Sequence, residues 1–170
     1  MTNIFKERRS IKSYTDEAIK DEELNYILEA GTYAPTGMNR QSPVMVVVRD
    51  KETIARLERE NGKVMGDENI KAFYGATTLV IVFRDADCFT GMEDACLVLG
   101  NLQNAAHAIG VGSCWIHRAK EVFEGEYGKS LMKKWGLGDN YKGVGHCILG
   151  YANMTPQTRP RKENYVIFDK

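Results

Sequence analysis

The segment Glu93–Ile109 limits most strongly what this chain can fold into. Apolar side chains cover most of the circumference of a helix there. They are Ala95, Leu97, Val98, Leu99, Leu102, Ala105, Ala106 and Ile109. A helix with so much apolar surface is stable only when most of that surface leaves water. We therefore expect this helix to be buried on most of its sides.

Short apolar runs that are rich in β-branched residues predict the strands. Val44–Val48 and Leu79–Phe83 have the continuous apolar pattern of strands buried on both faces, so we expect each to be a central strand. Ser113–His117 follows the glycines that end the long helix and predicts a third strand, and Val144–Leu149 predicts a fourth.

Further helices alternate with these strands. Asp21–Ala34 has apolar residues at helical spacing behind an N-cap at Asp21. Lys51–Met65 has the pattern of a charged amphipathic surface helix, and a helix is expected around Ser130–Trp135. The order of elements predicts an α+β fold with a central mixed β-sheet flanked by helices.

Length and charge narrow the class of protein. The chain has 170 residues and no internal repeat or linker before its tail, which predicts a single domain over residues 1–170. Its 23 basic residues balance 23 acidic ones, so the molecule has no excess charge with which to bind a polyanion. We therefore expect no nucleic-acid partner.

Hydropathy and cysteine spacing indicate the compartment. No run approaches the roughly 18 apolar residues of a membrane span, and Met1–Arg9 lacks the apolar stretch of a secretion signal. The cysteines have neither the spacing of a metal site nor the density of a disulfide scaffold. They are Cys88, Cys96, Cys114 and Cys147. A soluble cytoplasmic protein with reduced thiols and no membrane contact is expected.

The sequence contains no familiar hydrolytic or metal-binding arrangement. The 3 histidines lie far apart, which argues against a Ser/His/Asp or Cys/His centre. His146 and Cys147 are neighbours on a predicted strand, so their side chains point to opposite faces and cannot share a metal ion. We expect no metal site and no side chain that acts as the nucleophile.

Two basic clusters stand near the ends of the chain. The first is Arg8-Arg9-Ser10-Ile11-Lys12-Ser13-Tyr14 and the second is Arg159-Pro160-Arg161-Lys162. Either cluster alone is more simply explained as a solvated surface. Arginine carries a planar fork of donors that matches a phosphate monoester, however, so the two clusters folded together could hold one dianion.

Two further segments could approach a ring. Ala34–Gln41 is a loop of small and amide residues between a helix and a strand, and it is either an ordinary turn or a set of backbone donors. Gly110–His117 joins glycines, which allow close approach, to a strand with a Trp, and it is either a core strand or part of a binding surface.

Taken in this order and at these intervals, the four segments resemble the nitroreductase family of flavoproteins. The resemblance runs from Phe5 to Phe168 and includes an R-R-S-x-K start, an A-P-T-x-x-N-x-Q loop, a G-x-G-S-C-W-I strand and an R-P-R-K tail. It implies a nitroreductase-like fold, FMN as the cofactor, NADH or NADPH as the electron donor, and a homodimer with its FMN sites at the subunit interface. Residues 152–170 are then an arm that embraces the partner subunit, exchanged across the homodimer.

The resemblance also implies cofactor contacts residue by residue. In the first half of the chain they fall on Arg8, Arg9, Ser10, Lys12, Pro35, Thr36, Gly37, Asn39 and Asn69. In the second half they fall on Trp115, Ile116, His117, Arg159 and Arg161. The arginines and Ser10 meet the phosphate and ribityl chain, Lys12 and Asn69 the pyrimidine edge, and the loop at Pro35 the partner's flavin. A backbone N–H near His117 faces flavin N5.

In that family the flavin carries the chemistry and no side chain is required as a catalyst. The resemblance implies an oxidoreductase that passes hydride from NAD(P)H through FMN to a small-molecule acceptor, such as a nitroaromatic or a quinone, by a ping-pong mechanism. A different flavin reaction on the same fold, namely dehydrogenation, dehalogenation or flavin reduction, stays open, as does a non-catalytic flavin-binding protein. One departure is Ala72, where some members carry a basic residue; Lys71 is one place off.

Overall fold

The structure is a computed structural model and describes residues 3–169. Its helices are α1 Ile4–Glu7, α2 Asp21–Thr32, the short 3₁₀ helix η1 Gly37–Asn39, α3 Lys51–Val64, α4 Gly91–Ala108, α5 Ala119–Glu124 and α6 Glu126–Lys134. Its strands are β1 Val44–Val48, β2 Thr78–Asp85, β3 Gly112–Ile116 and β4 Tyr141–Gly150. The α+β class that the sequence predicts is confirmed. Helix α5 was not expected.

The strands form one sheet in the order β1-β2-β4-β3, and every neighbouring pair is antiparallel. The expectation of a mixed sheet is therefore wrong for these strands, and the parallel pairing found among the described residues is an isolated bridge from Ser10 to Ser113. The reason lies after α3: the chain returns to the end of the sheet where β1 stops, so Leu79 pairs with Val48 and β2 runs back.

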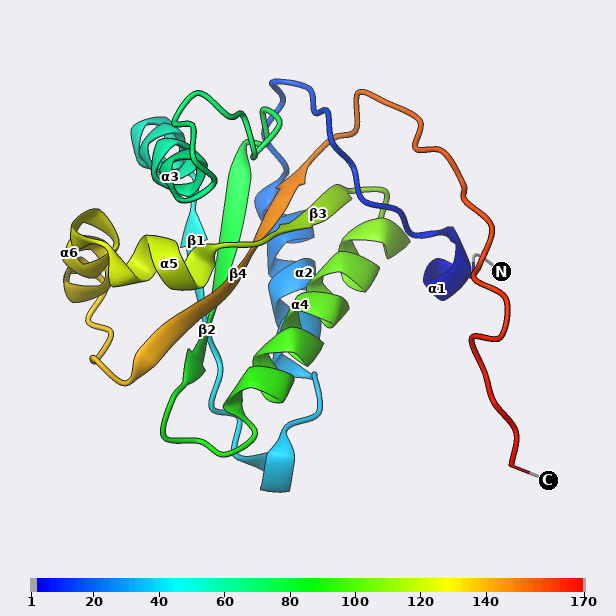
Figure 1. The fold of residues 1–170 in the computed structure, drawn as a ribbon. Helices are drawn as coiled ribbons and strands as arrows, with labels where there is room; N and C mark the ends of the chain where they lie inside the picture. The colour runs from blue at the N-terminus through cyan, green and yellow to red at the C-terminus, as the bar shows by residue number, and fades with distance from the viewer. Residues whose placement is uncertain (1–2, 170) are drawn as a thin grey trace.

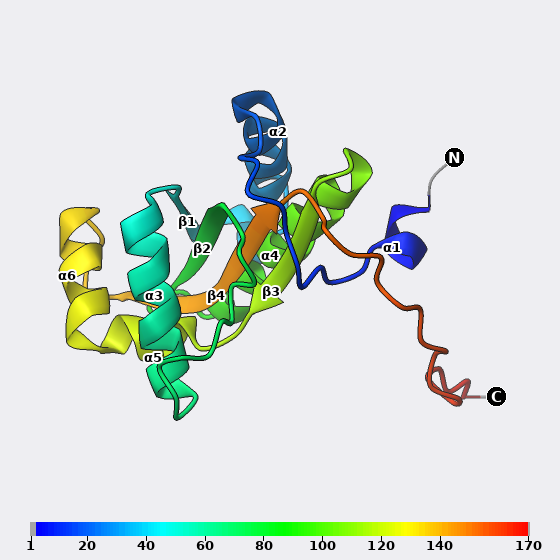
Figure 2. The same ribbon diagram turned by 90° about the horizontal axis from the view of Figure 1, so that it is seen from above.

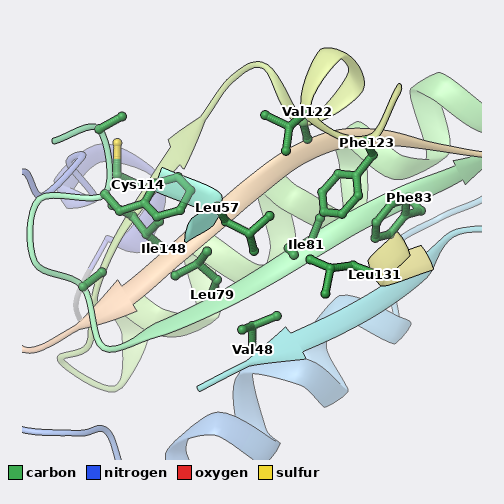
Figure 3. Close-up of a cluster of buried hydrophobic side chains, with 14 of the residues drawn as sticks. Val48, Leu57, Leu79, Ile81, Phe83, Cys114, Val122, Phe123, Leu131 and Ile148 are labelled. Carbon is green, nitrogen blue, oxygen red and sulfur yellow. The ribbon is translucent and has the colours of Figure 1, made fainter. Parts of the chain in front are cut away.

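Helices cover both faces of the sheet, α2 and α4 on one face and α3, α5 and α6 on the other (Figures 1 and 2). Each face has its own apolar cluster. On the second face, Leu57, Phe123 and Leu131 lie over strand β2 (Figure 3). On the first face, α4 contributes Val98, Leu99 and other residues to a cluster with Ile27 of α2. Burial of these side chains provides the main favourable term in folding.

Long helix α4 has the buried character that its composition predicts, with Ala95, Leu99 and Leu102 inaccessible to solvent. Strand β2 is central, also as expected. Strand β1 is not, because it forms an edge of the sheet and only Val48 is fully buried there. The expectation of a central position for Val44–Val48 is wrong: the apolar run indicated a strand but not its place in the sheet, and at this edge Val47 is 36% exposed.

Beyond β4 the chain leaves the body of the molecule as an extended arm that passes α1 (Figures 1 and 2). Residues 165–168 have a strand-like apolar pattern in the sequence, but they form no strand in this arm. Their apolar side chains are exposed, and Ile167 has 90% of its surface open to solvent. Within residues 3–169, no helix is both long enough and apolar enough to cross a membrane.

Candidate functional site

The opening segment Arg8–Thr15 is held against the start of β3 and the end of β4. The Ile11 N–H donates to the Ser113 carbonyl (2.9 Å), and the Thr15 N–H donates to the Tyr151 carbonyl (2.9 Å). Ile11 and Tyr14 are buried in the core between these contacts. The segment is therefore anchored on both sides of Lys12, whose side chain is exposed.

Glycines allow this close approach, as the sequence predicts for the strand after α4. A Cβ atom at Gly112 would lie 3.1 Å from Cγ1 of Ile11 and 3.2 Å from a ring carbon of Tyr14. A Cβ atom at Gly150 would lie 2.9 Å from the Tyr14 ring. Larger residues at either glycine would push the opening segment away from the sheet.

Arg8 and Arg9 present buried donor atoms without protein acceptors. Among residues 3–169, neither Nη1 of Arg8 nor Nε of Arg9 has a hydrogen-bond partner, although both atoms are shielded from solvent. Nη1 of Arg9 donates to the carbonyls of Lys6 (2.6 Å) and Arg8 (2.8 Å), which fixes that guanidinium. Buried donors are normally satisfied, so unpaired guanidinium nitrogens mark a place prepared for an anion.

Lys12 is a third cation of the opening segment. Its Nζ lies 5.9 Å from the ring centroid of Tyr74, in the segment after α3. Burial raises the pKa of Cys114 on β3, and a hydrogen bond from Ser10 and the charges of Lys12 and Arg8 act against that rise. The predicted residues Arg8, Ser10 and Lys12 are therefore gathered around one strand. Cys114 itself is buried in the apolar cluster on the α3 side of the sheet.

In the segment after α3, Asn69 and Lys71 both contact acidic side chains of this chain. The Asn69 amide is exposed and donates to the Asp67 carboxylate (3.0 Å). Ala72 is buried in the core, and Nζ of Lys71 lies 3.8 Å from a carboxylate oxygen of Glu58 on α3. Lys71 thus pairs with Glu58 of α3, and Ala72 offers no basic side chain.

The loop Pro35–Gln41 is rigid although little of this chain covers it. The Gly37 N–H donates to the buried Asp94 carboxylate of α4 (2.9 Å), and the Gln41 N–H donates to Oγ1 of Thr36 (3.1 Å). Met38 and Asn39 both have φ of 54°, a left-handed conformation that non-glycine residues rarely adopt. Backbone of this kind persists only where the surroundings impose it, and it is concentrated at binding sites.

Strand β3 divides its side chains between the two faces of the sheet. The Trp115 indole packs with the α4 cluster and lies over Gly145, where a Cβ atom would come within 2.3 Å of its Nε1. Ile116 packs on the α3 side. His117 follows the strand and is exposed, and its carbonyl accepts a hydrogen bond from Nδ2 of Asn61 (2.8 Å).

The predicted contacts form two groups, one near each end of α4. The loop is tied to Asp94 in the first turn of α4, and the opening segment pairs with β3, which follows the last turn. Asp94 lies 14 residues before Ala108, the last residue of α4, so these two attachment points are ~21 Å apart along the helix. Arg159 and Arg161 lie on the exposed arm, where Arg161 donates to the Arg159 carbonyl (3.0 Å). One chain alone therefore does not assemble the set.

Of two cavities in the structure, one lies beside a group of predicted contacts and the other does not. A cavity of 320 Å³ lies between Arg9, His107 at the end of α4 and Met154 at the start of the arm. A larger cavity of 730 Å³ lies between α6 and the start of β4, and none of the residues predicted to bind the cofactor lines it. The smaller cavity adjoins the opening segment, with Arg9 and Ile11 in its lining.

Sequence reasoning missed three residues that shape the site. Asp94 fixes the loop, Asn61 fixes the His117 carbonyl, and Arg118 has a left-handed φ of 78° directly after His117. Asn61 and Asp94 act on residues more than fifty positions away, so no local pattern could reveal them. A glycine at position 118 would have signalled the left-handed turn, and an arginine gives no such signal.

Both the sequence and the fold of this chain are similar to those of known proteins. The sequence model of the nitroreductase family matches residues 5–151. A nitroreductase from Bacteroides fragilis, solved with bound FMN, superposes with a TM-score of 0.89 at 26% identity and covers 100% of both chains. A protein of Archaeoglobus fulgidus, assigned as an NADH dehydrogenase or NAD(P)H nitroreductase, is 28% identical over 85% of this chain and 80% of its own length.

A third relative is an FMN reductase [NAD(P)H] of Bacillus subtilis, 28% identical over 63% of this chain. The match covers 49% of that longer protein, so its activity as a whole does not transfer directly. The family match, in contrast, covers most of the present chain, including the opening segment, the loop and strand β3. The chain belongs to the nitroreductase family.

Proposed function

We propose that the chain is an FMN-dependent NAD(P)H oxidoreductase that reduces a nitroaromatic, a quinone or a similar small acceptor. The observation that carries the proposal is the pair of buried, unpartnered guanidinium atoms of Arg8 and Arg9 beside Lys12, in a chain of this family. These residues fit a phosphate-bearing flavin because they offer charge-assisted donors that the described part of the chain leaves unused.

Each group of residues has a distinct task in the proposal. Arg8, Arg9 and Ser10 bind the phosphate and ribityl chain, and Lys12 places its ammonium at the pyrimidine edge, together with Asn69. Strand β3, with Trp115 and Ile116 packed on its two faces, holds a rigid edge for the ring.

The remaining contacts come from a second subunit in the proposal. The loop that holds Pro35, Thr36, Gly37 and Asn39 is attached ~21 Å along α4 from the end of the helix that adjoins the opening segment, too far to contact the same isoalloxazine ring from the same chain. A homodimer places the loop of one subunit over the flavin of the other. Residues 152–170 then form the arm of a single domain, and Arg159 and Arg161 complete the phosphate site.

FMN, once bound, would supply hydride transfer at its N5 atom, from NAD(P)H in one half of a ping-pong cycle and to the acceptor in the other. The protein's own residues orient the ring, stabilise developing negative charge and exclude water from one ring face. Between β1 and β2 the chain has α3 and a short return segment, which leaves little to cover the outer face and supports broad acceptor use. A cytoplasmic location is supported by the free thiols of all four cysteines.

The visible absorption spectrum of freshly purified protein tests the proposal directly. We expect a flavin spectrum, release of FMN on denaturation, and NAD(P)H oxidation that depends on added acceptor. Protein that is colourless and takes up no added FMN would refute the proposal. Flavin binding without NAD(P)H oxidation above that of free FMN would favour a non-catalytic binder, and activity limited to another substrate class would favour a different flavin reaction on the same fold.

A further inference from the structure

Asn61, in the last turn of α3, is a buried amide whose hydrogen bonds are half satisfied. Its side chain has 0% of its surface exposed. Nδ2 donates to the His117 carbonyl (2.8 Å), and within residues 3–169 Oδ1 has no partner. Burying an amide costs free energy that hydrogen bonds have to offset. The bond to His117 is therefore the contact that this asparagine provides.

That bond fixes the direction of the next N–H. A trans peptide unit is planar, so its C=O and N–H point in opposite directions. Because Asn61 draws the His117 carbonyl toward α3, the N–H of Arg118 points away from α3. The left-handed φ of 78° at Arg118 accompanies this orientation.

The carbonyl of Arg118 and one of its guanidinium nitrogens are engaged by α5. Its carbonyl accepts from the Val122 N–H (3.0 Å), and its Nη1 donates to Oε1 of Glu121 (3.1 Å). The remaining N–H donates to Nδ1 of the preceding residue, His117 (2.8 Å). The imidazole belongs to an exposed side chain that can rotate, so this acceptor is replaceable.

We propose that Asn61 is a positioning residue that presents the Arg118 N–H to the flavin, and that Nδ1 of His117 holds this donor until a flavin acceptor atom replaces it. The proposal rests on the proposed function. His117 directly follows the strand that carries Cys114, around which Ser10 and Lys12 gather. The donor thus follows the strand around which the cations of the opening segment gather, and the imidazole contributes no catalytic group.

Asn61→Asp tests the role of the amide donor. The carboxylate has nearly the same shape, but it cannot donate to the His117 carbonyl and repels it. We expect the dissociation constant for FMN to rise roughly tenfold at about pH 8, and the midpoint potential of the bound flavin to become more negative. Asn101→Asp is the matched control, because Nδ2 of Asn101 also donates to a backbone carbonyl, that of Ala30 (3.0 Å), away from β3.

Protonation provides a rescue that a general loss of packing would not show. Burial raises the pKa of a carboxyl group, and the carboxyl group introduced by Asn61→Asp, once protonated, could again donate to the carbonyl. The ratio of variant to wild-type dissociation constants should therefore approach one toward about pH 5. A ratio of one and an unchanged potential at about pH 8 would overturn the proposal, as would a loss in the Asn101→Asp control of the same size.

A measurement on the unaltered chain covers the case in which the variant does not fold. In ¹⁵N-labelled protein, added FMN should shift the Arg118 amide resonance, because a flavin acceptor atom replaces Nδ1 of His117 as the partner of that N–H. A resonance unaffected by bound FMN would refute the inference, whereas a chain that binds no FMN at all would refute the proposed function and leave the contact between His117 and Arg118 intact.

Discussion

Lys12 is the single residue whose charge matters most to the proposed chemistry. Negative charge develops at N1 and the C2 carbonyl when the flavin is reduced, and a fixed ammonium there stabilises the reduced cofactor more than the oxidised one. In Lys12→Met we expect the two-electron midpoint potential to fall by roughly 30 mV, which corresponds to about 1.4 kcal/mol. The affinity of the oxidised protein for FMN should change less.

Lys71→Met is the control for Lys12→Met in spectroelectrochemical titration. Lys71 is an exposed lysine on the neighbouring segment, and its ammonium pairs with Glu58. Lys71→Met should leave the midpoint potential of the flavin unchanged. If Lys12→Met and wild type share one potential, Lys12 is a solvated surface lysine and its assignment to the pyrimidine edge is wrong.

Single residues also show where sequence reasoning stops. Arg8, Ser10 and Lys12 could be predicted together because they share one short segment with a recognisable spacing, and the structure places them around β3. Asn61 could not, since its partner His117 is 56 positions away and the contact exists only after α3 has docked. The pairing of Lys71 with Glu58 depends on tertiary structure in the same way.

At the scale of elements, periodicity predicted the type of most segments and left their arrangement open. Apolar runs predicted β1, β2, β3 and β4 as strands, since only a buried sheet accommodates such runs. They did not reveal that β1 is an edge strand or that all pairs are antiparallel, because both depend on how the connections return. Helix α5 was missed because it is 6 residues long, too short for a period to emerge.

Strand β4 carries a histidine that should make folding sensitive to pH. His146 has 0% of its surface exposed. Its ring centroid lies 5.2 Å from that of Phe73 and 6.1 Å from that of Phe123. Within residues 3–169, neither of its ring nitrogens has a hydrogen-bond partner. Burial lowers the pKa of His146 to about 4, from 6.5. Between these values the unfolded chain takes up a proton that the folded chain does not, so stability falls as pH falls.

The size of this effect can be measured by urea unfolding. The free energy of unfolding should drop by about 1.4 kcal/mol per pH unit below 6.5, or about 2 kcal/mol by pH 5, before most carboxylates titrate. His146→Leu, which keeps an apolar side chain between the two rings, should remove this slope. Equal slopes for variant and wild type would mean that His146 is protonated in the folded protein.

At the scale of the whole molecule, exposed apolar side chains mark the surface that a partner would cover. Phe89, Met92 and Leu97 lie before or along α4, and Phe89 has 96% of its surface exposed. Met38 lies on the loop that Asp94 holds, and the apolar end of the arm at 165–168 contacts no part of its own sheet. Patches of this kind usually belong to an interface, and a homodimer would bury them symmetrically.

Mixed dimers test whether each flavin site is shared between subunits. One variant, Arg8→Ala with Arg9→Ala, lacks the phosphate contacts. The other, Gly37→Val, displaces the loop, because a Cβ atom there lies 2.3 Å from Oγ1 of Thr90. Each variant alone should hold little FMN.

In a dimer of one chain of each kind, the intact opening segment of one chain meets the intact loop of the other, so one of the two sites is restored. Co-expression with two affinity tags isolates this dimer, which should bind one FMN per two chains. A mixed dimer without flavin, or a monomer that holds FMN tightly in dilute solution, would show that each site belongs to a single chain.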